Sequence, residues 1–459
     1  MAKTNYTTSA LKSRTVRVRE VSESIQYGHT ASATQRQEGP RFLRITDIQD
    51  GKVDWESVPS CDIVAEDVPK YRLSKGDLVF ARTGATTGKS FLIRDCPEAV
   101  FASYLIRVRA SSDVDPRYLA LFFQSPDYWQ QIERGKRGIG QPNVNGKILG
   151  EIELPLPPLD EQQRIVAEIE KQFTRLDAGV TSLKRIQAAL KRYRASVLKA
   201  ACEGRLVPTE AELARKGNRS YETGEQLLQR ILVERRDRWT GKRKYKEPRG
   251  PLAIANLPSL PDGWVWASID QISTKVVDGV HKKPRYVPEG IPFVTVRNLT
   301  AGPGISFEKI NYITIDDHTE FIKRADPEKG DILVSKDGTL GVIRVINTDA
   351  KFSIFVSVAM VKPVVRDMSA FLGIVLSAPQ VQIQMVPKGS GLQHIHLEDL
   401  REDCIPLPPL AEQRRIVEEV ERRLSPIEAL QAQITINIQR AARLRQSTLS
   451  NAFDAASTI

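Results

Sequence analysis

The sequence predicts an α+β protein made of two copies of one β-rich mixed α/β module, each followed by a long helix. Three observations predict this fold. One segment occurs twice in the chain, which indicates an internal duplication. A long run without a turn signal follows each copy, which is typical of a helix. Short β-branched runs bounded by glycines precede each copy, which is typical of strands.

The duplication is read directly from the sequence. Residues 155–178 are PLPPLDEQQRIVAEIEKQFTRLDA and residues 406–429 are PLPPLAEQRRIVEEVERRLSPIEA, identical at 13 of 24 positions with an offset of 251. Downstream, Arg194 recurs as Arg445 at the same offset. The chain therefore has a module–helix–module–helix order. The predicted segments are a first module at 1–158, its helix at 159–203, a linker at 204–261, a second module at 262–409 and its helix at 410–455.

Each long helix has a clear start and an apolar stripe. The proline pair before Leu159 excludes an earlier start, and Asp160 suits the N-cap or the first turn. The second helix carries Pro426, which predicts a kink there or a fresh helix capped by Ser425. The stripe residues are Leu176, Val180, Leu183, Leu190, Val197, Leu424, Ile427, Ile434 and Ile438. We expect the stripes to pack as an antiparallel coiled coil with pseudo-twofold symmetry; the alternative packs each helix on its own module.

Within the modules, short apolar runs predict strands and hairpins. The expected strands are 77–81, 91–93, 332–334, 342–346 and one buried strand at 352–361, and the expected short helices are 116–124 and 369–377. The linker is rich in charge, with a helix expected at 224–238. Its basic patch suits a nucleic-acid backbone or, equally, a solvated charge run.

Composition limits the class of protein. Hydrophobic residues make up 41% and charged residues 27%, which excludes wholesale disorder, and the net charge of +11 suits a polyanionic partner. No apolar run is long enough to cross a membrane, and the N-terminus resembles no secretory signal. The four cysteines are far apart, as expected of a cytoplasmic protein. His394 and His396 are half of a metal site at most, so we expect no bound metal.

The segment Gly84–Ser90 (GATTGKS) superficially resembles a phosphate-binding loop. Three residues separate its glycines where that motif needs four, and a strand rather than a helix follows. We therefore expect a hairpin tip that carries Arg82, Thr83, Lys89 and Ser90. The duplicate tip would carry Lys336 and Asp337, and either tip suits contact with a nucleic acid or plain exposure to solvent. No nucleophile motif is visible, so we expect no active site.

These features together resemble a known family. The doubled P-L-P-P-L-x-E-Q-x-R-I-V motif, the stretches 278–299 and 227–239, and the GDL and GDI hairpins are similar to specificity subunits of type I restriction–modification systems. The resemblance implies a non-catalytic subunit whose modules are target recognition domains, each reading half of a bipartite, asymmetric site on double-stranded DNA. It implies that the helices dock two methyltransferase subunits and that motor–nuclease subunits join. S-adenosylmethionine, ATP and magnesium would belong to those partners, and this chain would bind no cofactor.

Candidate DNA contacts lie on loops that differ between the copies. Asparagine and glutamine suit adenine, arginine suits guanine, and lysine mainly holds phosphate. The candidates are Arg82, Thr83, Lys89, Ser90, Lys136, Arg137, Gln141, Asn143, Asn145, His281, Lys282, Lys283, Lys336, Asp337, Lys388, Gln393, His394 and His396. Two alternatives stay open. A protein-binding scaffold would show sequence-blind, salt-insensitive behaviour, and a DNA adenine methyltransferase would need an Asn-Pro-Pro-Tyr-like motif that the sequence lacks.

Overall fold

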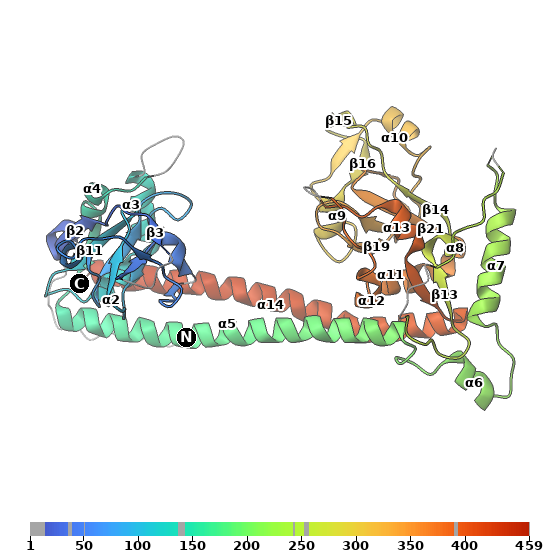
Figure 1. The fold of residues 1–459 in the computed structure, drawn as a ribbon, viewed down its shortest axis with the longest axis horizontal. Coiled ribbons are helices and arrows are strands. Elements are labelled where there is room, and N and C mark those ends of the chain that lie inside the picture. Colours follow the sequence, from blue (N-terminus) through green and yellow to red (C-terminus); the bar gives the residue numbers. More distant parts are fainter. Residues whose placement is uncertain are drawn as a thin grey trace. The chain divides into compact units, whose positions relative to one another are not determined.

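A computed structural model describes residues 14–458 apart from 35–38, 50, 136–142, 242–243, 252–256 and 390–392. The chain divides into two compact units (Figure 1). Unit 1 comprises residues 1–185 and 433–459, and unit 2 comprises residues 186–432. The two long helices, α5 (Leu159–Cys202) and α14 (Leu410–Thr458), each contribute a segment to both units. The predicted α+β class and the two long helices are confirmed.

Unit 1 contains two four-stranded sheets. The first has the order β2-β11-β8-β9 and is antiparallel; the second has the order β10-β4-β7-β3, in which β10 and β4 are parallel. Strands β1 and β12 pair at the base of the module, and β5 pairs with β6. The strands are β1 (Arg14–Arg17), β2 (Ser22–Tyr27), β3 (Ala33–Thr34), β4 (Arg41–Leu43), β5 (Ile48–Gln49), β6 (Lys52–Val53), β7 (Ser60–Cys61), β8 (Leu78–Ala81), β9 (Ser90–Leu92), β10 (Ala99–Phe101), β11 (Leu105–Ala110) and β12 (Glu153–Leu156).

Short helices link these strands. Helix α2 begins with a proline, and the Asp115 carboxylate caps it by accepting from the Arg117 backbone N–H at 2.8 Å, as expected of a helix N-terminus. The helices are η1 (Val18–Val21), η2 (Ile45–Asp47), α1 (Val68–Tyr71), α2 (Pro116–Phe122), α3 (Pro126–Gly135) and α4 (Gly146–Gly150).

Unit 2 repeats the sheet architecture of unit 1. Its central sheet has the order β14-β21-β18-β19, its second sheet β20-β16-β17-β15 has the same parallel pair at one edge, and β13 pairs with β22. The duplication therefore extends from the sequence to the strand order. The strands are β13 (Val265–Ser268), β14 (Ser273–Asp278), β15 (Tyr286–Val287), β16 (Ile291–Val294), β17 (Asn311–Ile313), β18 (Ile332–Ser335), β19 (Ile343–Val345), β20 (Ser353–Ile354), β21 (Val358–Pro363) and β22 (Cys404–Leu407).

The helix within the predicted linker packs onto the rest of unit 2. The helix expected at 224–238 is present as α7, and its buried Leu227, Leu228 and Ile231 join the core of unit 2. Its basic end is engaged within the unit, since Arg235 and Arg238 donate to the backbone carbonyls of Ser273 and Val364. The helices of unit 2 are α6 (Glu210–Lys216), α7 (Gly224–Asp237), α8 (Ile269–Ile272), α9 (Val296–Thr300), α10 (Ile315–Phe321), η3 (Arg366–Met368), α11 (Ser369–Leu376), α12 (Pro379–Gln382) and α13 (Leu397–Glu402).

The single strand predicted at 352–361 is wrong. A turn interrupts this apolar run, where the Val358 N–H donates to the Phe355 carbonyl at 2.9 Å. The run therefore supplies β20 to one sheet and β21 to the other. Both strands are buried, so apolar content alone gave no sign of the break.

Of the two alternatives expected at Pro426, a kink or a fresh helix capped by Ser425, the fresh helix is wrong. Helix α14 continues through Pro426 as one element. Proline removes one backbone donor and crowds the preceding turn, so the local helix is weakened. The buried side chains of Leu424 and Ile427 flank it and belong to the core of unit 2, and we attribute the continuity to this packing.

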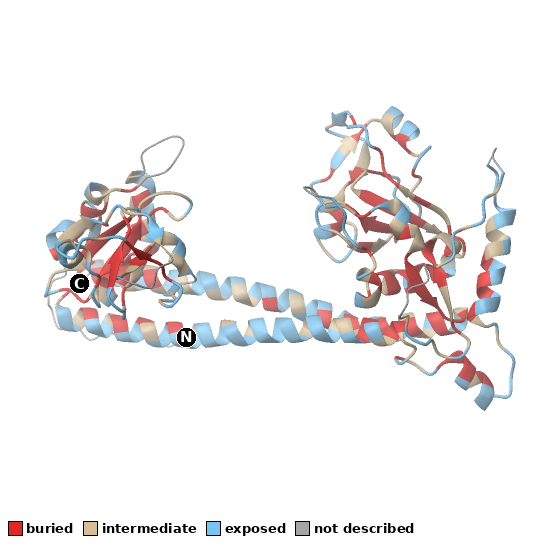
Figure 2. Ribbon diagram, viewed as in Figure 1, coloured by how far each residue is buried: buried red, intermediate tan, exposed pale blue. Residues whose placement is uncertain are grey.

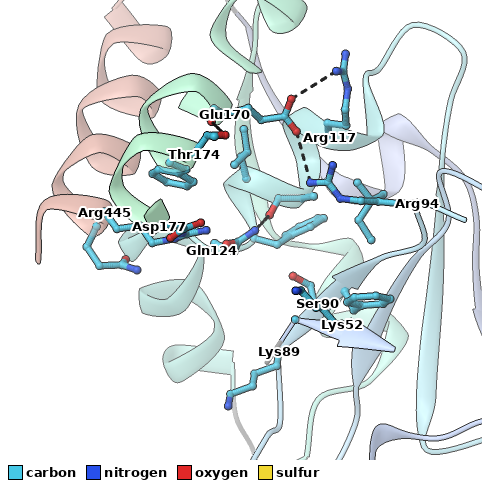
Figure 3. Close-up of a pocket in the computed structure, with 18 of the residues that line it drawn as sticks. Lys52, Lys89, Ser90, Arg94, Arg117, Gln124, Glu170, Thr174, Asp177 and Arg445 are labelled. Atoms are coloured by element: carbon cyan, nitrogen blue, oxygen red, sulfur yellow. Dashed lines mark hydrogen bonds and ion pairs between the residues drawn. The ribbon is translucent and has the colours of Figure 1, made fainter. Parts of the chain in front are cut away.

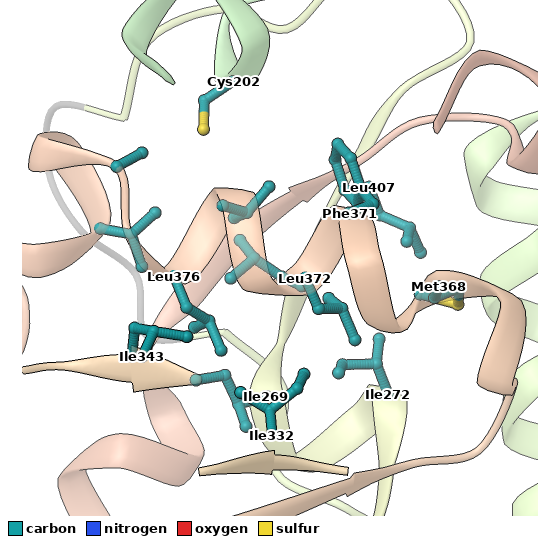
Figure 4. Close-up of a cluster of buried hydrophobic side chains, with 14 of the residues drawn as sticks. Cys202, Ile269, Ile272, Ile332, Ile343, Met368, Phe371, Leu372, Leu376 and Leu407 are labelled. Atoms are coloured by element: carbon teal, nitrogen blue, oxygen red, sulfur yellow. The ribbon is translucent and has the colours of Figure 1, made fainter. Parts of the chain in front are cut away.

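In each unit, segments of the two long helices lie side by side against a module. In unit 2, Val197 and Leu198 of α5 share a core with Val420 of α14. Figure 4 shows part of this core, with Cys202 of α5 near Leu372 and Leu376 of helix α11. In unit 1, Phe453 of α14 packs against Tyr118 of α2, with ring centroids 5.3 Å apart. The segments run antiparallel in both units. Away from these cores the helices are largely exposed (Figure 2).

The duplicated proline motif fixes the junction between module and helix. The Gln162 side chain is buried and donates to the Pro157 carbonyl at 2.9 Å, and Gln413 donates to the Pro408 carbonyl at 2.9 Å. The carbonyls of Pro157 and Pro408 precede the first helical turn, and the glutamine side chains give each of them a hydrogen-bond donor. The motif therefore has a structural role in both units.

Candidate nucleic-acid interface

The structure brings the two predicted sets of loop residues together in each unit. In unit 1 the β8–β9 hairpin has its tip after Arg82, and Thr83 forms a β-bridge with Asn143. In unit 2 the equivalent bridge joins Asp337 to His394. The predicted hairpins are confirmed, and in each unit the hairpin tip and the segment that follows the glycine-rich loop form one surface.

We define tip surface 1 by Arg82, Thr83, Lys89 and Asn143. The Lys89 side chain is exposed, and Arg82 and Thr83 are half-buried. The Asn143 Oδ1 atom is buried without a hydrogen-bond partner among the described residues, a state that costs free energy unless a ligand satisfies it. Asn145 caps α4 by accepting from the Ile148 N–H at 2.9 Å, so its oxygen has a structural partner.

Other candidates of unit 1 have different settings. Ser90 is half-buried in strand β9. Lys136, Arg137 and Gln141 lie outside the described residues. Their predicted role in DNA binding stays a prediction.

We define tip surface 2 by Asp337, Lys388, Gln393 and His394. The Lys388 and Gln393 side chains are exposed, and Lys388 pairs with Asp399 at 2.7 Å. The rings of His394 and His396 lie side by side with centroids 4.6 Å apart. His281, Lys282 and Lys283 form an exposed basic segment after β14.

The residue before the hairpin turn differs between the units. In unit 1 the Arg82 guanidinium lies over the Tyr27 ring, 5.1 Å from its centroid. In unit 2 the corresponding Lys336 is 8% exposed, and its Nζ lies 3.5 Å from Asp278 Oδ2. Lys336 therefore does not present a free charge on the surface, contrary to the expectation of an exposed tip lysine.

Sequence reasoning missed one residue of this surface. Tyr104 is 65% exposed, and its carbonyl accepts from the Arg82 N–H at 3.0 Å, which places it beside the tip. An exposed aromatic ring next to cations suits stacking on a base or a sugar. The available signal was a lone tyrosine between two short apolar runs, Ala99–Phe101 and Leu105–Ala110.

A pocket of about 820 Å³ lies beside the hairpin of unit 1, between strand β9 and helices α2, α5 and α14 (Figure 3). Its arginines are paired: Arg94 and Arg117 both approach Glu170, and Arg445 pairs with Asp177. Lys89 lines the mouth of the pocket and has no ion pair within the described part of the chain. The arginines thus link the module to the helices, while Lys89 is available to a ligand.

The predicted helix-packing residues are buried or half-buried. Those that are buried are Val197, Leu424, Ile427 and Ile434, and those that are half-buried are Leu176, Val180, Leu183, Leu190 and Ile438. Ion pairs accompany them, Asp177 with Arg445 in unit 1 and Glu428 with Arg194 in unit 2, each at 2.9 Å.

Two features of the described residues bear on the kind of site. In the described ranges, no cluster of three or more histidine, cysteine, aspartate or glutamate side chains is arranged to hold a metal ion. Among the described helices, none combines the length and the apolar character needed to span a bilayer.

Two similar modules with dissimilar polar tips, each joined to a long helix, define a duplicated recognition protein. The comparisons with known proteins identify the class further. The family described as the type I restriction modification DNA specificity domain matches residues 14–192 and 261–440. The chain belongs to this family.

Two relatives and one solved structure each match nearly the whole length of this chain. The chain is 24% identical over 428 residues to the EcoBI specificity subunit of Escherichia coli, covering 91% of this chain and 80% of that protein. It is 22% identical over 430 residues to the EcoKI specificity subunit of Escherichia coli strain K12, covering 90% and 81%. A chain in a solved structure on the assembly and conformational transition of the type I R-M system has a TM-score of 0.60 at 22% identity, with 96% and 97% covered.

The predicted membership of the specificity-subunit family is confirmed. The protein is a specificity subunit of a type I restriction–modification system, the non-catalytic part that recognises the DNA target. Subunits of this kind bind no cofactor themselves and work with DNA and partner subunits. Neither the scaffold nor the methyltransferase alternative has support from the comparisons.

Proposed function

We propose that each unit reads one half of a bipartite, asymmetric site on double-stranded DNA through its tip surface. The observation that carries this proposal is the equivalent bridge in the two units, Thr83 to Asn143 and Asp337 to His394. The backbone arrangement is the same, but the side chains that it presents differ. A shared scaffold with unlike side chains supports two unlike half-sites, about one helical turn of DNA apart.

We also propose that the long helices dock two methyltransferase subunits. Two exposed apolar residues occupy duplicated positions, Tyr193 of α5 at 43% exposure and Leu444 of α14 at 55%. Exposed apolar side chains in equivalent places favour two copies of one partner. Serine substitution of Tyr193 should weaken one docking event and serine substitution of Leu444 the other, as measured by the mass of the assembled complex.

The remaining partners follow from the same proposal. Motor–nuclease subunits join the complex for cleavage, and S-adenosylmethionine, ATP and magnesium bind to the partner subunits. The protein acts in the cytoplasm, where the host DNA lies.

The experiment that tests the reading of DNA is the sequencing of methylated genomic DNA from a host that carries the complete system. We expect one split, asymmetric motif with a fixed gap. Binding of the purified complex to that motif should weaken steeply with salt, since phosphate contacts release counterions. A sequence-blind, salt-insensitive complex would support the scaffold alternative.

A further inference from the structure

The cation that precedes each hairpin turn occupies the same place in both units. In unit 1, Ala81 faces Leu105 across the central sheet, and Arg82 follows. In unit 2, Ser335 faces Val358, and Lys336 follows. The partner, Tyr27 or Asp278, lies at the end of β2 or β14, which is separated from the hairpin by one strand, β11 or β21.

In unit 1 the cation keeps its charge available. The Arg82 guanidinium stacks on the Tyr27 ring, and the Tyr27 hydroxyl accepts from the Gly146 N–H at 2.9 Å, which holds the ring in place. No carboxylate among the described residues is within ion-pair distance of Arg82, and its Nε is buried without a hydrogen-bond partner. A stacked guanidinium leaves its in-plane N–H groups free for a pair of acceptors.

In unit 2 two acids, Asp278 and Asp337, neutralise the cation. Asp278 is 3% exposed, and its carboxylate faces Lys336 at 3.5 Å and His281 at 3.4 Å, and also pairs with Arg324. Lys336 itself is 8% exposed. Lys336 Nζ also lies 4.0 Å from Asp337 Oδ1, so the carboxylates of Asp278 and Asp337 together offset the charges of Lys336 and Arg324. A buried lysine within a group that has no net charge gives little attraction to a distant phosphate.

We propose that the residue at position 27 in unit 1, or at position 278 in unit 2, decides whether the cation before the hairpin turn can bind DNA. Tyr27 leaves Arg82 free to bind two acceptors of the duplex, whereas Asp278 retains Lys336 within the protein. The two units therefore contribute unequally to DNA binding at an otherwise equivalent position. This inference rests on the proposed function and names the residues that set the asymmetry.

Two sources on DNA offer paired acceptors, phosphate oxygens and the O6 and N7 atoms of guanine. The variant Arg82→Ala in the complete complex distinguishes them. Loss of a phosphate contact weakens binding to all sequences and reduces the slope of log K against log salt by about 0.9. Loss of a guanine contact removes the preference at one base pair of the half-site read by unit 1. Either result supports the proposal, with a loss of affinity of about tenfold.

The partner residues are tested by exchange. Tyr27→Asp recreates the arrangement of unit 2 and should reproduce the loss caused by Arg82→Ala, while Tyr27→Phe, which keeps the ring and loses only the hydroxyl contact with Gly146, should lose much less affinity. Lys336→Ala should change affinity by less than about twofold, and Asp278→Asn should release Lys336 and steepen the salt slope by about 0.9. Because Asp278→Asn also unpairs Arg324, the steepening belongs to Lys336 only if it disappears in the double variant Asp278→Asn with Lys336→Ala. Thr15→Asp adds the same charge at an exposed position of β1 and serves as the control.

The outcomes are decisive when each variant unfolds thermally as the wild type does. Equal losses for Arg82→Ala and Lys336→Ala, or no loss for Tyr27→Asp, would overturn the proposal while the wild-type complex still binds its bipartite site. A wild-type complex with no preferred site and no salt dependence would instead overturn the proposed function, and this inference with it.

Discussion

The Arg445 guanidinium lies 2.9 Å from the Asp177 carboxylate in unit 1. The residues 251 positions away, Arg194 and Glu428, form the same ion pair at 2.9 Å in unit 2. Antiparallel pairing of two duplicated helices produces this relation, because the arginine of each copy then faces the acid of the other copy. One arginine position and one acidic position of the duplicated helix thus form an ion pair in each unit.

The two ion pairs should have similar strength. Their side chains are partly exposed, so we expect a coupling free energy of about 0.2–1 kcal/mol for each. Double-mutant cycles of alanine variants, followed by thermal unfolding at low salt, measure both. Charge reversal of Arg194 alone should lower stability, and simultaneous reversal of Glu428 should restore it. Coupling in only one of the two pairs would contradict the equivalence.

The buried glutamines of the two junctions should differ in their contribution to stability. The Gln162 side chain also accepts from the Asp115 N–H at 2.9 Å, whereas the Gln413 Oε1 atom is buried without a described partner. Gln162→Leu should therefore cost about 1–3 kcal/mol, because it leaves buried backbone groups unpaired, and Gln413→Leu should cost less. Chemical denaturation compares them, and a larger loss for Gln413→Leu would contradict this assignment.

Stability should depend on pH through Asp403. Burial raises the pKa of its carboxyl to about 7, with repulsion from Asp399 as a second cause. An aspartate of the unfolded chain titrates at about 3.9. As the pH rises from about 4 to 7, the unfolded state loses this proton while the folded state keeps it, so stability falls.

The variant Asp403→Asn should remove that pH dependence. It should be more stable than the wild type at pH 8 and similar at pH 4, as measured by thermal unfolding across this range. The exposed Asp349 supplies the control, since Asp349→Asn removes an acid that is 82% exposed. If the stability of the wild type and that of Asp403→Asn change with pH in the same way between pH 4 and 8, Asp403 is not buried in its protonated form.

The spacing of apolar residues and the positions of proline and glycine predicted the main elements of this fold. The helix start at Leu159, the hairpins and α7 were all predicted, because proline, glycine and apolar spacing act locally. The strand break at Phe355 was not predicted, since two adjacent buried strands read as one apolar run. The sequence left open whether the second helix kinks or restarts at Pro426, because tertiary packing, which local spacing does not reveal, decides whether a helix continues through a helix breaker.

The candidate site was predicted in part. Hairpin and loop residues were named separately, and only the structure shows the bridges that join them. The burial of Lys336 depends on Asp278, which lies far away in the sequence, so spacing could not reveal it. Tyr104 was missed because a single exposed aromatic residue has no pattern.

The length of α5 should set the tolerated gap between half-sites. Four residues inserted after Gln187 add about one helical turn, or about 6 Å, to this continuous helix. The gap in the methylated motif should change or methylation should be lost. Four residues inserted after the exposed Ser220, outside the long helices, should leave the gap unchanged. An unaltered gap in the first variant would show that α5 does not set the spacing.

The central claim is that each module reads its own half-site. The most direct measurement is methylome sequencing of a host in which residues 1–158 have been replaced by the first module of another specificity subunit. The account predicts a motif in which one half is new and the other half is retained. A motif changed in both halves, or in neither, would contradict independent reading.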